Sequence, residues 1–162
     1  MRVGLIADTH GLVRPEALKA LEGADRVLHA GDVGDPAVLD ALGAIAPVHA
    51  IRGNVDEPEA IRRRRGTKKP AEDWALELPE TLDLTLEGFR VHVLHDRKLY
   101  GVGNHDVVVA GHSHQPLVEE RAGVIHVNPG SAGPRRFSLP ISVGWLELYR
   151  GAPPRTEIVP LD

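Results

Sequence analysis

Short apolar runs alternate with helical patterns in the first third of the chain. Three of these runs have the length of a strand and end in polar loops: Val3–Ala7, Arg26–Ala30 and Val48–Ile51. Between them, Pro15–Leu21 and Pro36–Leu42 show helical spacing, and each begins with a proline, which suits the first turn of a helix. Strands that alternate with helices predict right-handed crossovers and a parallel sheet, whose ligands gather beyond the carboxyl ends of the strands.

The second half of the chain shows strand patterns and almost no helical pattern. Leu82–Leu86 and Phe89–Leu94 flank a Glu-Gly pair, which predicts a β-hairpin. Further strands are expected at Val107–Ala110, Leu117–Arg121, Val124–Asn128, Ile141–Tyr149 and Thr156–Val159. We therefore expect an α/β fold of two sheets packed face to face, the first more parallel and the second more antiparallel, with helices outside. No linker divides the halves, so residues 1–162 are expected to form a single domain.

Composition narrows the chemistry that the chain can perform. Hydrophobic residues make up 42% and charged residues 26% of its 162 residues, which is the balance of a folded domain. The absence of cysteine excludes disulfides and thiolate ligands, so any metal must be bound by nitrogen and oxygen. The chain has nine histidines that could supply the nitrogen. No apolar stretch is long enough to span a membrane, and Met1–Ala7 lacks signal-peptide features, so we expect a cytoplasmic protein.

The charge balance argues against general binding to polyanions. With 19 basic and 23 acidic residues, the net charge is −4. Arg62–Lys69 is an exception, with six basic residues in eight, and we interpret it as an exposed loop. We expect no specific nucleic-acid binding. A nuclease or RNA-processing role for this run is an alternative that requires salt-dependent binding to single-stranded nucleic acid.

Side chains that bind metals follow several of the predicted strands. Asp8 and His10 are two positions apart, and so are His112 and His114. On an extended segment residues i and i+2 point to the same side, so each pair offers two ligands to one site. The histidine pair is the more specific signal, because packing gives no reason for two alternate histidines after an apolar run. An Asp-x-His sequence alone is more often a loop or a helix cap.

Three further polar residues, Asp32, Asn54 and His95, follow other strands. The first two come after Gly31 and Gly53, which let the backbone pass close to a site, although such sequences are also common in simple turns. The combined set of two aspartates, one asparagine and four histidines exceeds the needs of one zinc site. It suits two divalent ions about 3.5–4 Å apart that share a carboxylate. A binuclear metal site is the leading hypothesis.

The order of these motifs resembles the signature blocks of the calcineurin-like metallophosphoesterases. The blocks are Asp8-x-His10, Gly31-Asp32, Gly53-Asn54-x-Asp56, His95 after an apolar strand, and Gly111-His112-x-His114. The chain is most similar to the small, YfcE-like phosphodiesterase branch, whose Asn-Pro-Gly-Ser loop matches residues 128–131. This resemblance implies a four-layer α/β/β/α sandwich of two mixed sheets, the metallophosphoesterase fold, with a dinuclear metal centre between the loops of the sheets.

The resemblance also implies a role for each residue of the blocks. One ion would be bound by Asp8, His10 and His114 and the other by Asn54, His95 and His112, with Asp32 bridging the two. The cofactors would be two divalent ions per chain (Mn, Fe, Ni or Zn), because imidazole and carboxylate ligands do not discriminate finely among these metals. The reaction would be in-line attack of a water or hydroxide, held between the ions, on a small phosphate-ester substrate, which Asn54 would help to orient.

The chain departs from the family pattern beside two of the blocks. Val55 stands where many relatives have the histidine assigned to leaving-group protonation, so we expect modest rates on unactivated monoesters. Asp56 is a candidate acid or base, with a turn-stabilising role as the alternative. Asp96 adds a negative charge after His95, and Arg97 is expected to offset it or to contact substrate phosphate.

Two more segments near the blocks carry expectations. Residues 97–106 are short and interrupted by glycine where relatives often have a helix, so we expect a turn or a loop there. Arg135 and Arg136 follow the 128–131 loop and are candidates for contact with substrate phosphate, with a solvated pair as the alternative.

The remaining histidines are expected to have no metal role. His29, His49 and His92 lie inside strand patterns and are expected to be hydrogen-bonded structural residues. His105 is expected to be exposed in a loop, and His126 to reach the site only indirectly.

A metal-dependent phosphodiesterase or phosphatase is the leading prediction for function. The alternative is a non-catalytic scaffold for protein partners, as in the Vps29-like relatives, which typically lose a metal-binding histidine, whereas all seven ligand positions are filled here. A homodimer is a further hypothesis, with Trp74 or the strand near Trp145 as the apolar contact and burial in the core as the alternative.

Overall fold

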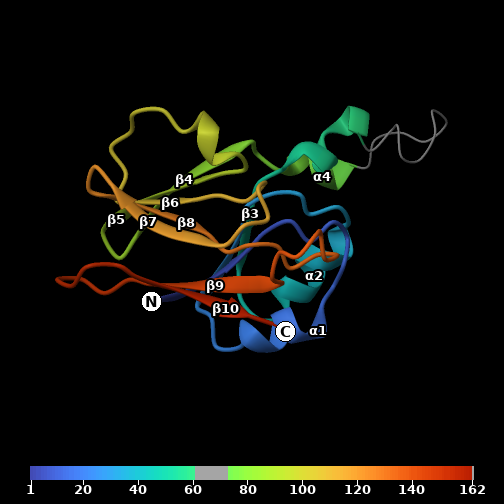
Figure 1. Ribbon diagram of the computed structural model, residues 1–162, viewed down its shortest axis with the longest axis horizontal. Helices are drawn as coiled ribbons and strands as arrows, with labels where there is room; N and C mark the ends of the chain where they lie inside the picture. The colour runs from blue at the N-terminus through green and yellow to red at the C-terminus, as the bar shows by residue number, and fades with distance from the viewer. Residues whose placement is uncertain (61–72, 162) are drawn as a thin grey trace.

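The computed structural model describes residues 1–60 and 73–161, whose strands form two five-stranded sheets (Figure 1). The strand order in the first sheet is β10 (Arg155–Pro160), β9 (Ser142–Glu147), β1 (Arg2–Ile6), β2 (Arg26–His29) and β3 (Val48–Ala50). The order in the second sheet is β4 (Thr81–Leu86), β5 (Phe89–Leu94), β6 (Val107–Val109), β8 (Val124–Asn128) and β7 (Leu117–Arg121). The basic run Arg62–Lys69 lies outside the described residues.

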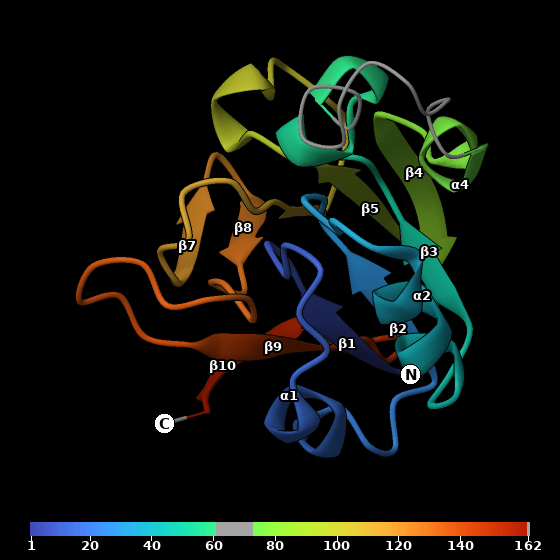
Figure 2. The same ribbon diagram turned by 90° about the vertical axis from the view of Figure 1, so that its right-hand side faces the viewer.

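The two sheets contain the same mixture of parallel and antiparallel pairs. In the first, β1, β2 and β3 are parallel, while β9 and β10 are antiparallel to their neighbours. In the second, β5, β6 and β8 are parallel, and β4 and β7 pair antiparallel at the edges. The prediction of a more parallel first sheet and a more antiparallel second sheet is wrong. The reason is that β9 and β10 return to pair beside β1 (Figure 2) instead of extending the second sheet.

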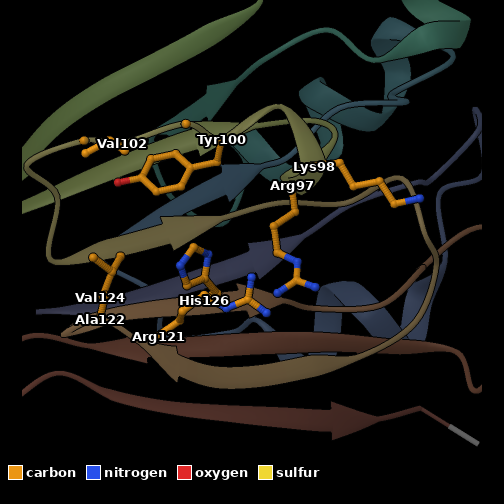
Figure 3. Close-up of a pocket in the computed structure, with 10 residues that line it drawn as sticks. Arg97, Lys98, Tyr100, Val102, Arg121, Ala122, Val124 and His126 are labelled. Carbon is orange, nitrogen blue, oxygen red and sulfur yellow. The ribbon is translucent and has the colours of Figure 1, made fainter.

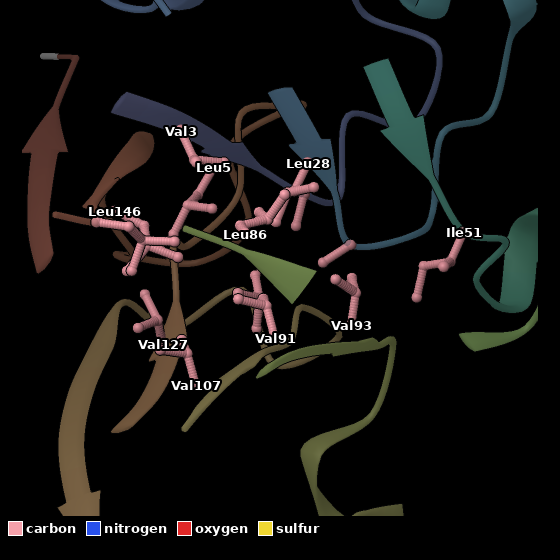
Figure 4. Packing of buried hydrophobic residues seen from close by; sticks show 14 residues of the cluster. Val3, Leu5, Leu28, Ile51, Leu86, Val91, Val93, Val107, Val127 and Leu146 are labelled. Carbon is pink, nitrogen blue, oxygen red and sulfur yellow. The ribbon is translucent and has the colours of Figure 1, made fainter. Parts of the chain in front are cut away.

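The inner faces of the two sheets bury the main core between them. Figure 4 shows Val3, Leu5 and Leu28 of the first sheet packed toward Val91 and Val127 of the second, each at most 1% exposed. Strands that are covered on both faces appear in a sequence as continuous apolar runs, which is why the hydrophobic pattern predicted these strands. The core fixes the sheets face to face, so the carboxyl ends of β1, β2, β3, β5 and β6 meet at one edge.

Two helices cover the outer face of the first sheet (Figure 2). They are α1 (Pro15–Ala20) and α2 (Pro36–Gly43), each with its proline in the first turn, as predicted. Val38 and Leu42 of α2 pack in one buried cluster with Val143 of β9. These contacts confirm the helical layer expected on this side of the sandwich.

The outer face of the second sheet is covered more thinly. Residues 97–106 cross it, and the described part of this layer contains one short 3-10 turn, η2 (Arg97–Leu99), and no α-helix. Tyr100 packs there against Val108 and Ala110. The expected turn or loop in place of a helix is confirmed, and the fourth layer of the sandwich is correspondingly small.

Smaller features complete the description. A second 3-10 turn, η1 (Asn54–Asp56), and a short helix, α4 (Asp73–Glu77), have no counterpart in the predicted elements.

Trp145 is 6% exposed in β9, with the guanidinium carbon of Arg2 4.2 Å from its ring centroid, so burial in the core is confirmed for this tryptophan. None of the helices in the described residues is long and apolar enough to cross a membrane.

Candidate metal centre

The loops after β1 and β2 lie side by side at the carboxyl edge of the first sheet. The backbone N–H of Asp8 donates to the carbonyl of Gly31, and that of His10 donates to the carbonyl of Asp32, both at 3.0 Å. These bonds continue the parallel pairing beyond the strands. They therefore hold Asp8, His10 and Asp32 next to one another without any contribution from their side chains.

Four side chains, which we call the inner cluster, converge at this edge: Asp8, His10, Asp32 and His114. One ligand atom of each lies within 4.8 Å of the other three. His10 Nε2 is 3.3 Å from His114 Nε2 and 3.6 Å from Asp32 Oδ2, and His114 Nε2 is 3.5 Å from Asp8 Oδ1. His114 comes from the loop after β6, so both sheets contribute to the inner cluster.

The other predicted ligands lie beside the inner cluster. His95 follows β5, and its Nε2 is 3.4 Å from Asp32 Oδ1, while its ring centroid is 5.2 Å from that of His112. The backbone N–H of His112 donates to Asp8 Oδ2 at 3.0 Å. Asn54, His95 and His112 line a cavity of about 300 Å³. The structure thus brings all seven predicted residues to one edge, with the inner cluster largely buried and Asn54 and His112 exposed.

The backbone is left-handed at five of the seven residues. The φ angles are +54° at Asp8, +49° at His10, +55° at Asp32, +68° at His112 and +58° at His114. This conformation costs roughly 1–2 kcal/mol at a residue other than glycine, although Asp, Asn and His tolerate it better than most. Strained backbone of this kind gathers at functional sites because the surrounding structure has to hold it in place.

Two glycines give the ligands their space. A Cβ atom on Gly53 would lie 2.3 Å from both the backbone nitrogen and Oδ1 of Asp32. A Cβ atom on Gly31 would lie 2.6 Å from Nδ1 of His95. Both distances are far below any van der Waals contact. The prediction that these glycines let the backbone pass close to the site is confirmed.

The surroundings of His95 leave Nε2 as its metal-binding atom. Its Nδ1 is 2.8 Å from the carbonyl oxygen of Ala30, and because a carbonyl only accepts, Nδ1 carries a proton. Its Nε2 is buried and has no hydrogen-bond partner among the described residues, although Asp32 lies beside it. A cation between Nε2 and the carboxylate would satisfy both groups, so the nitrogen and oxygen donors present here fit a divalent metal ion.

Burial and neighbouring charges shift the pKa values of the predicted ligands in different directions. Burial raises the pKa of Asp8 to about 7, and the charge of Asp32 adds to this effect. Burial acts to lower the pKa of His95, but its interaction with Asp32 outweighs burial and raises the value to about 9, and the same interaction holds the pKa of Asp32 at about 2. Burial lowers the pKa of His10, and it lowers that of His114 to about 4. Both of these rings are therefore neutral at pH 7, which is the form that binds metals.

Asp56 connects two of the loops. Its buried carboxylate accepts hydrogen bonds from the backbone N–H groups of Val33 (2.9 Å), Gly34 (2.8 Å) and Gly53 (2.9 Å). Three backbone donors thus occupy both of its oxygens. This geometry joins the loop after β2 to the loop after β3, as the turn-stabilising alternative describes.

Arg97 lies in a different cavity from the metal ligands. Its guanidinium donates to the carboxylate of Glu119, and it lines a cavity of about 450 Å³ on the outer face of the second sheet (Figure 3). Tyr100 and His126 line the same cavity. Asp96, in contrast, lies near the metal site, with Oδ2 3.9 Å from Nε2 of His112.

Other arginines approach the site. A guanidinium nitrogen of Arg136 is 3.5 Å from Nε2 of His10, whereas Arg135 donates to a backbone carbonyl at 3.2 Å. No sequence signal distinguishes these two neighbours. Arg52, which sequence reasoning missed, lines the 300 Å³ cavity and is ion-paired with Glu80 at 2.7 Å. Its place directly before the Gly-Asn motif is the signal that was overlooked.

The remaining histidines follow the predictions with one exception. His29, His49 and His92 each share a hydrogen bond with a neighbouring side chain, which confirms that these rings are hydrogen-bonded as predicted. The prediction of an exposed His105 is wrong: its side chain is 20% exposed, and its Nε2 is 2.8 Å from Asp83 Oδ1. A carboxylate from the neighbouring hairpin draws the ring onto the sheet.

The fold and the site together define the class of protein. The model of the calcineurin-like phosphoesterase superfamily domain matches residues 1–151. The chain therefore belongs to this superfamily, whose members use divalent metal ions. The two mixed sheets that the motifs implied are confirmed as the metallophosphoesterase fold.

Individual relatives agree with this assignment. The phosphodiesterase YfcE of Escherichia coli is 30% identical over 162 aligned positions, which cover 91% of this chain and 88% of that protein. A probable metallophosphoesterase of Methanothermobacter thermautotrophicus is 31% identical over 157 positions, covering 86% and 82%. The solved structure of YfcE has a TM-score of 0.67 at 26% identity and covers 91% of this chain and 88% of its own. Vps29 of Entamoeba histolytica complexed with zinc has a TM-score of 0.68 at 22% identity over the whole of both chains, which shows the fold alone.

Proposed function

We propose that the protein is a phosphodiesterase that depends on two divalent metal ions and hydrolyses a small phosphate ester. The observation that carries this proposal is the convergence of four ligand atoms, from Asp8, His10, Asp32 and His114, within 4.8 Å. The unpartnered and buried Nε2 of His95 beside them supports a second ion. Similarity to phosphodiesterase YfcE supports the reaction class.

Asp32 is the residue that we propose to bridge the ions. Its Oδ2 faces His10 at 3.6 Å, whereas its Oδ1 faces His95 at 3.4 Å. One oxygen is therefore directed to each half of the site. In this proposal the first ion is held by Asp8, His10 and His114, and the second by Asn54, His95 and His112.

The chain supplies the rest of the chemistry around the ions. When bound, two such ions lower the pKa of a water and neutralise charge on the phosphoryl oxygens. Asn54, exposed beside the 300 Å³ cavity, orients the ester, and Arg136 is placed near His10 to meet a phosphoryl oxygen. Asp56 acts as a positioning residue, because its oxygens hold the two loops that carry Asp32 and Asn54.

Val55 shapes the choice of substrate. Its apolar side chain cannot protonate a leaving group, and the Val55 backbone N–H donates to Asp32 Oδ1 at 3.0 Å. An ester with a good leaving group needs no proton donor. We therefore propose that rates fall steeply as the pKa of the leaving alcohol rises, and that aryl diesters are cleaved faster than alkyl monoesters.

The direct test is hydrolysis of bis(4-nitrophenyl) phosphate with added Mn²⁺, comparing the wild type with Asp32→Ala and His112→Ala. We expect both variants to lose at least about 100-fold in rate and to bind fewer metal equivalents. His49→Ala is the matched control, because it removes a histidine of β3 that is bonded to Arg26 and belongs neither to the inner cluster nor to the lining of the 300 Å³ cavity. Activity that is equal in all four proteins would refute the proposal.

A non-catalytic scaffold is the second candidate, and the fold likeness to Vps29 favours it. It predicts metal binding without hydrolysis. Two metal equivalents per chain and no turnover of monoesters, diesters or cyclic nucleotides would therefore support the scaffold over the enzyme.

A further inference from the structure

A second group of metal-binding side chains lies on the outer face of the second sheet. Asp83, His92 and His105 place one ligand atom each within 4.8 Å of the other two, and we call them the outer cluster. Asp83 on β4 is directly opposite His92 on β5, and His105 arrives from the segment that follows η2. None of the three belongs to the inner cluster, although His92 also lines the 300 Å³ cavity beside it.

The three side chains already point at one another. Asp83 Oδ1 is 2.8 Å from His92 Nδ1 and 2.8 Å from His105 Nε2. The two imidazole centroids are 4.7 Å apart. The other nitrogen of His105, Nδ1, is 3.1 Å from the hydroxyl of Tyr100. The Asp83 carboxylate only accepts, so His92 Nδ1 and His105 Nε2 carry the protons of these two bonds, and a metal ion would take the place of both protons. The Tyr100 hydroxyl is placed to accept from Nδ1 of His105 once Nε2 binds the ion, as outer partners of metal-bound histidines usually do.

Two imidazole nitrogens and one carboxylate oxygen form the donor set of an open zinc site completed by water. In a tetrahedral site with bonds of about 2.0 Å the ligand atoms are about 3.3 Å apart, so Asp83 has to withdraw by about half an ångström. Its side chain is 68% exposed and has room to do so. A cavity of about 250 Å³ beside Asp83 and His105 has space for the water.

The local charge does not oppose a cation. Arg90 also lines this cavity, and its guanidinium donates hydrogen bonds to the carboxylate of Asp106 at 3.2 and 3.3 Å. The guanidinium is thus neutralised by its own partner. The negative charge of the Asp83 carboxylate can therefore balance part of the charge of a divalent ion, so we expect the site to attract a cation.

We propose that the outer cluster is a separate metal site that binds Zn²⁺ through Asp83, His92 and His105. The ion ties the segment of residues 97–106 to the β4–β5 hairpin. This is the face where no α-helix is present in the described residues and where the packing around Tyr100 is small. The role of the site is therefore structural and independent of hydrolysis.

The test is to count zinc equivalents by mass spectrometry after dialysis of the wild type, Asp83→Asn and His105→Gln against Zn²⁺. We expect each variant to bind one equivalent fewer than the wild type and to keep its phosphodiesterase rate. His49→Gln is the matched control, because it removes a histidine bonded to Arg26 and is expected to lose no equivalent. Equal zinc content in all four proteins would overturn the proposal.

A second measurement separates a metal site from three hydrogen-bonded side chains. In NMR titrations with added Zn²⁺ at constant pH, the ring signals of His92 and His105 are expected to shift and to level off at saturation, because bound zinc replaces a proton on each ring. Ring signals of both histidines that do not change as Zn²⁺ is added would show that Asp83 only accepts hydrogen bonds. Circular dichroism in chelator checks that each variant is folded, and Asp83→Asn, at an exposed position, is the variant expected to fold in every case.

Discussion

The inner and outer clusters contain the same kinds of side chain but are built in different ways. The four residues of the inner cluster all have left-handed backbone, and glycines are required beside them. The outer cluster has ordinary backbone throughout, since none of its three residues has a positive φ. Its members are brought together by the register of a hairpin and by a side chain from a loop.

This difference shows how strongly each cluster depends on the surrounding structure to hold it in place. The inner cluster is buried, so its charges and strain are held by two sheets whether or not an ion is bound. The outer cluster is partly exposed and satisfies its own hydrogen bonds. A rigid, strained site is suited to chemistry, whereas an unstrained surface site is suited to holding two segments together.

The largest expected effect concerns the pH dependence of stability in the chelator-treated protein. The folded-state pKa of His95 is about 9 and its ordinary value is 6.5, so protonation of this residue stabilises the fold fully below pH 6.5. That contribution is lost as the pH rises through 9. We expect the free energy of unfolding to fall by up to about 3 kcal/mol between pH 6.5 and 9.

Urea denaturation at several pH values measures this loss. His95→Gln is expected to remove most of the fall and to leave the smaller part that comes from Asp8, whose pKa of about 7 also lies in this range. His92→Gln, in the outer cluster, is expected to leave the fall intact. A wild type whose stability does not change over this range would contradict the assigned proton on His95.

The next effect is a change in activity from one methyl group. In Gly53→Ala the new Cβ would lie 2.3 Å from the Asp32 backbone and carboxylate, so the proposed bridging ligand has to move. We expect the rate on an aryl diester to fall about 100-fold, as displacement of a reacting group by about 1 Å does elsewhere. Steady-state kinetics at saturating metal measure this change.

Gly103→Ala is the matched control near the outer cluster. Its Cβ would meet the ring of His105 at 2.5 Å and the hydroxyl of Tyr100 at 2.7 Å, which are ends of side chains that can move. We expect the rate to be unchanged in this variant. Equal losses in both variants would show that the crowding at Gly53 has no special effect on catalysis.

The sequence predicted the parts of the fold and site that depend on local order. Buried parallel strands have continuous apolar runs, and ligands at strand ends have fixed spacing, so Asp8, His10 and Asp32 were found with their strands. The return of β9 to pair with β1 was not predicted, because strand patterns do not record which sheet a strand joins. Distant contacts decide that choice.

Side-chain partners were harder to predict than strand ends. Arg97 is held by Glu119 from β7, a contact between strands that only the folded sheet brings together. The outer cluster, however, was within reach of the sequence. A two-residue turn after Leu86 pairs Asp83 with His92 by simple counting, but this register was overlooked and no metal role was expected for His92.

The smallest expected effect distinguishes the backbones of the two clusters directly. His112, beside the inner cluster, has φ +68° and a side chain that is 45% exposed, so His112→Gly removes strain and little packing. In chelator, we expect this variant to be more stable than the wild type by about 0.5–1 kcal/mol. His92→Gly in strand β5 is expected to be less stable by about 1 kcal/mol, because glycine weakens a strand and the bond to Asp83 is lost. Chemical denaturation of both variants measures the two shifts, and shifts of the same sign would show that left-handed backbone at the metal centre carries no strain.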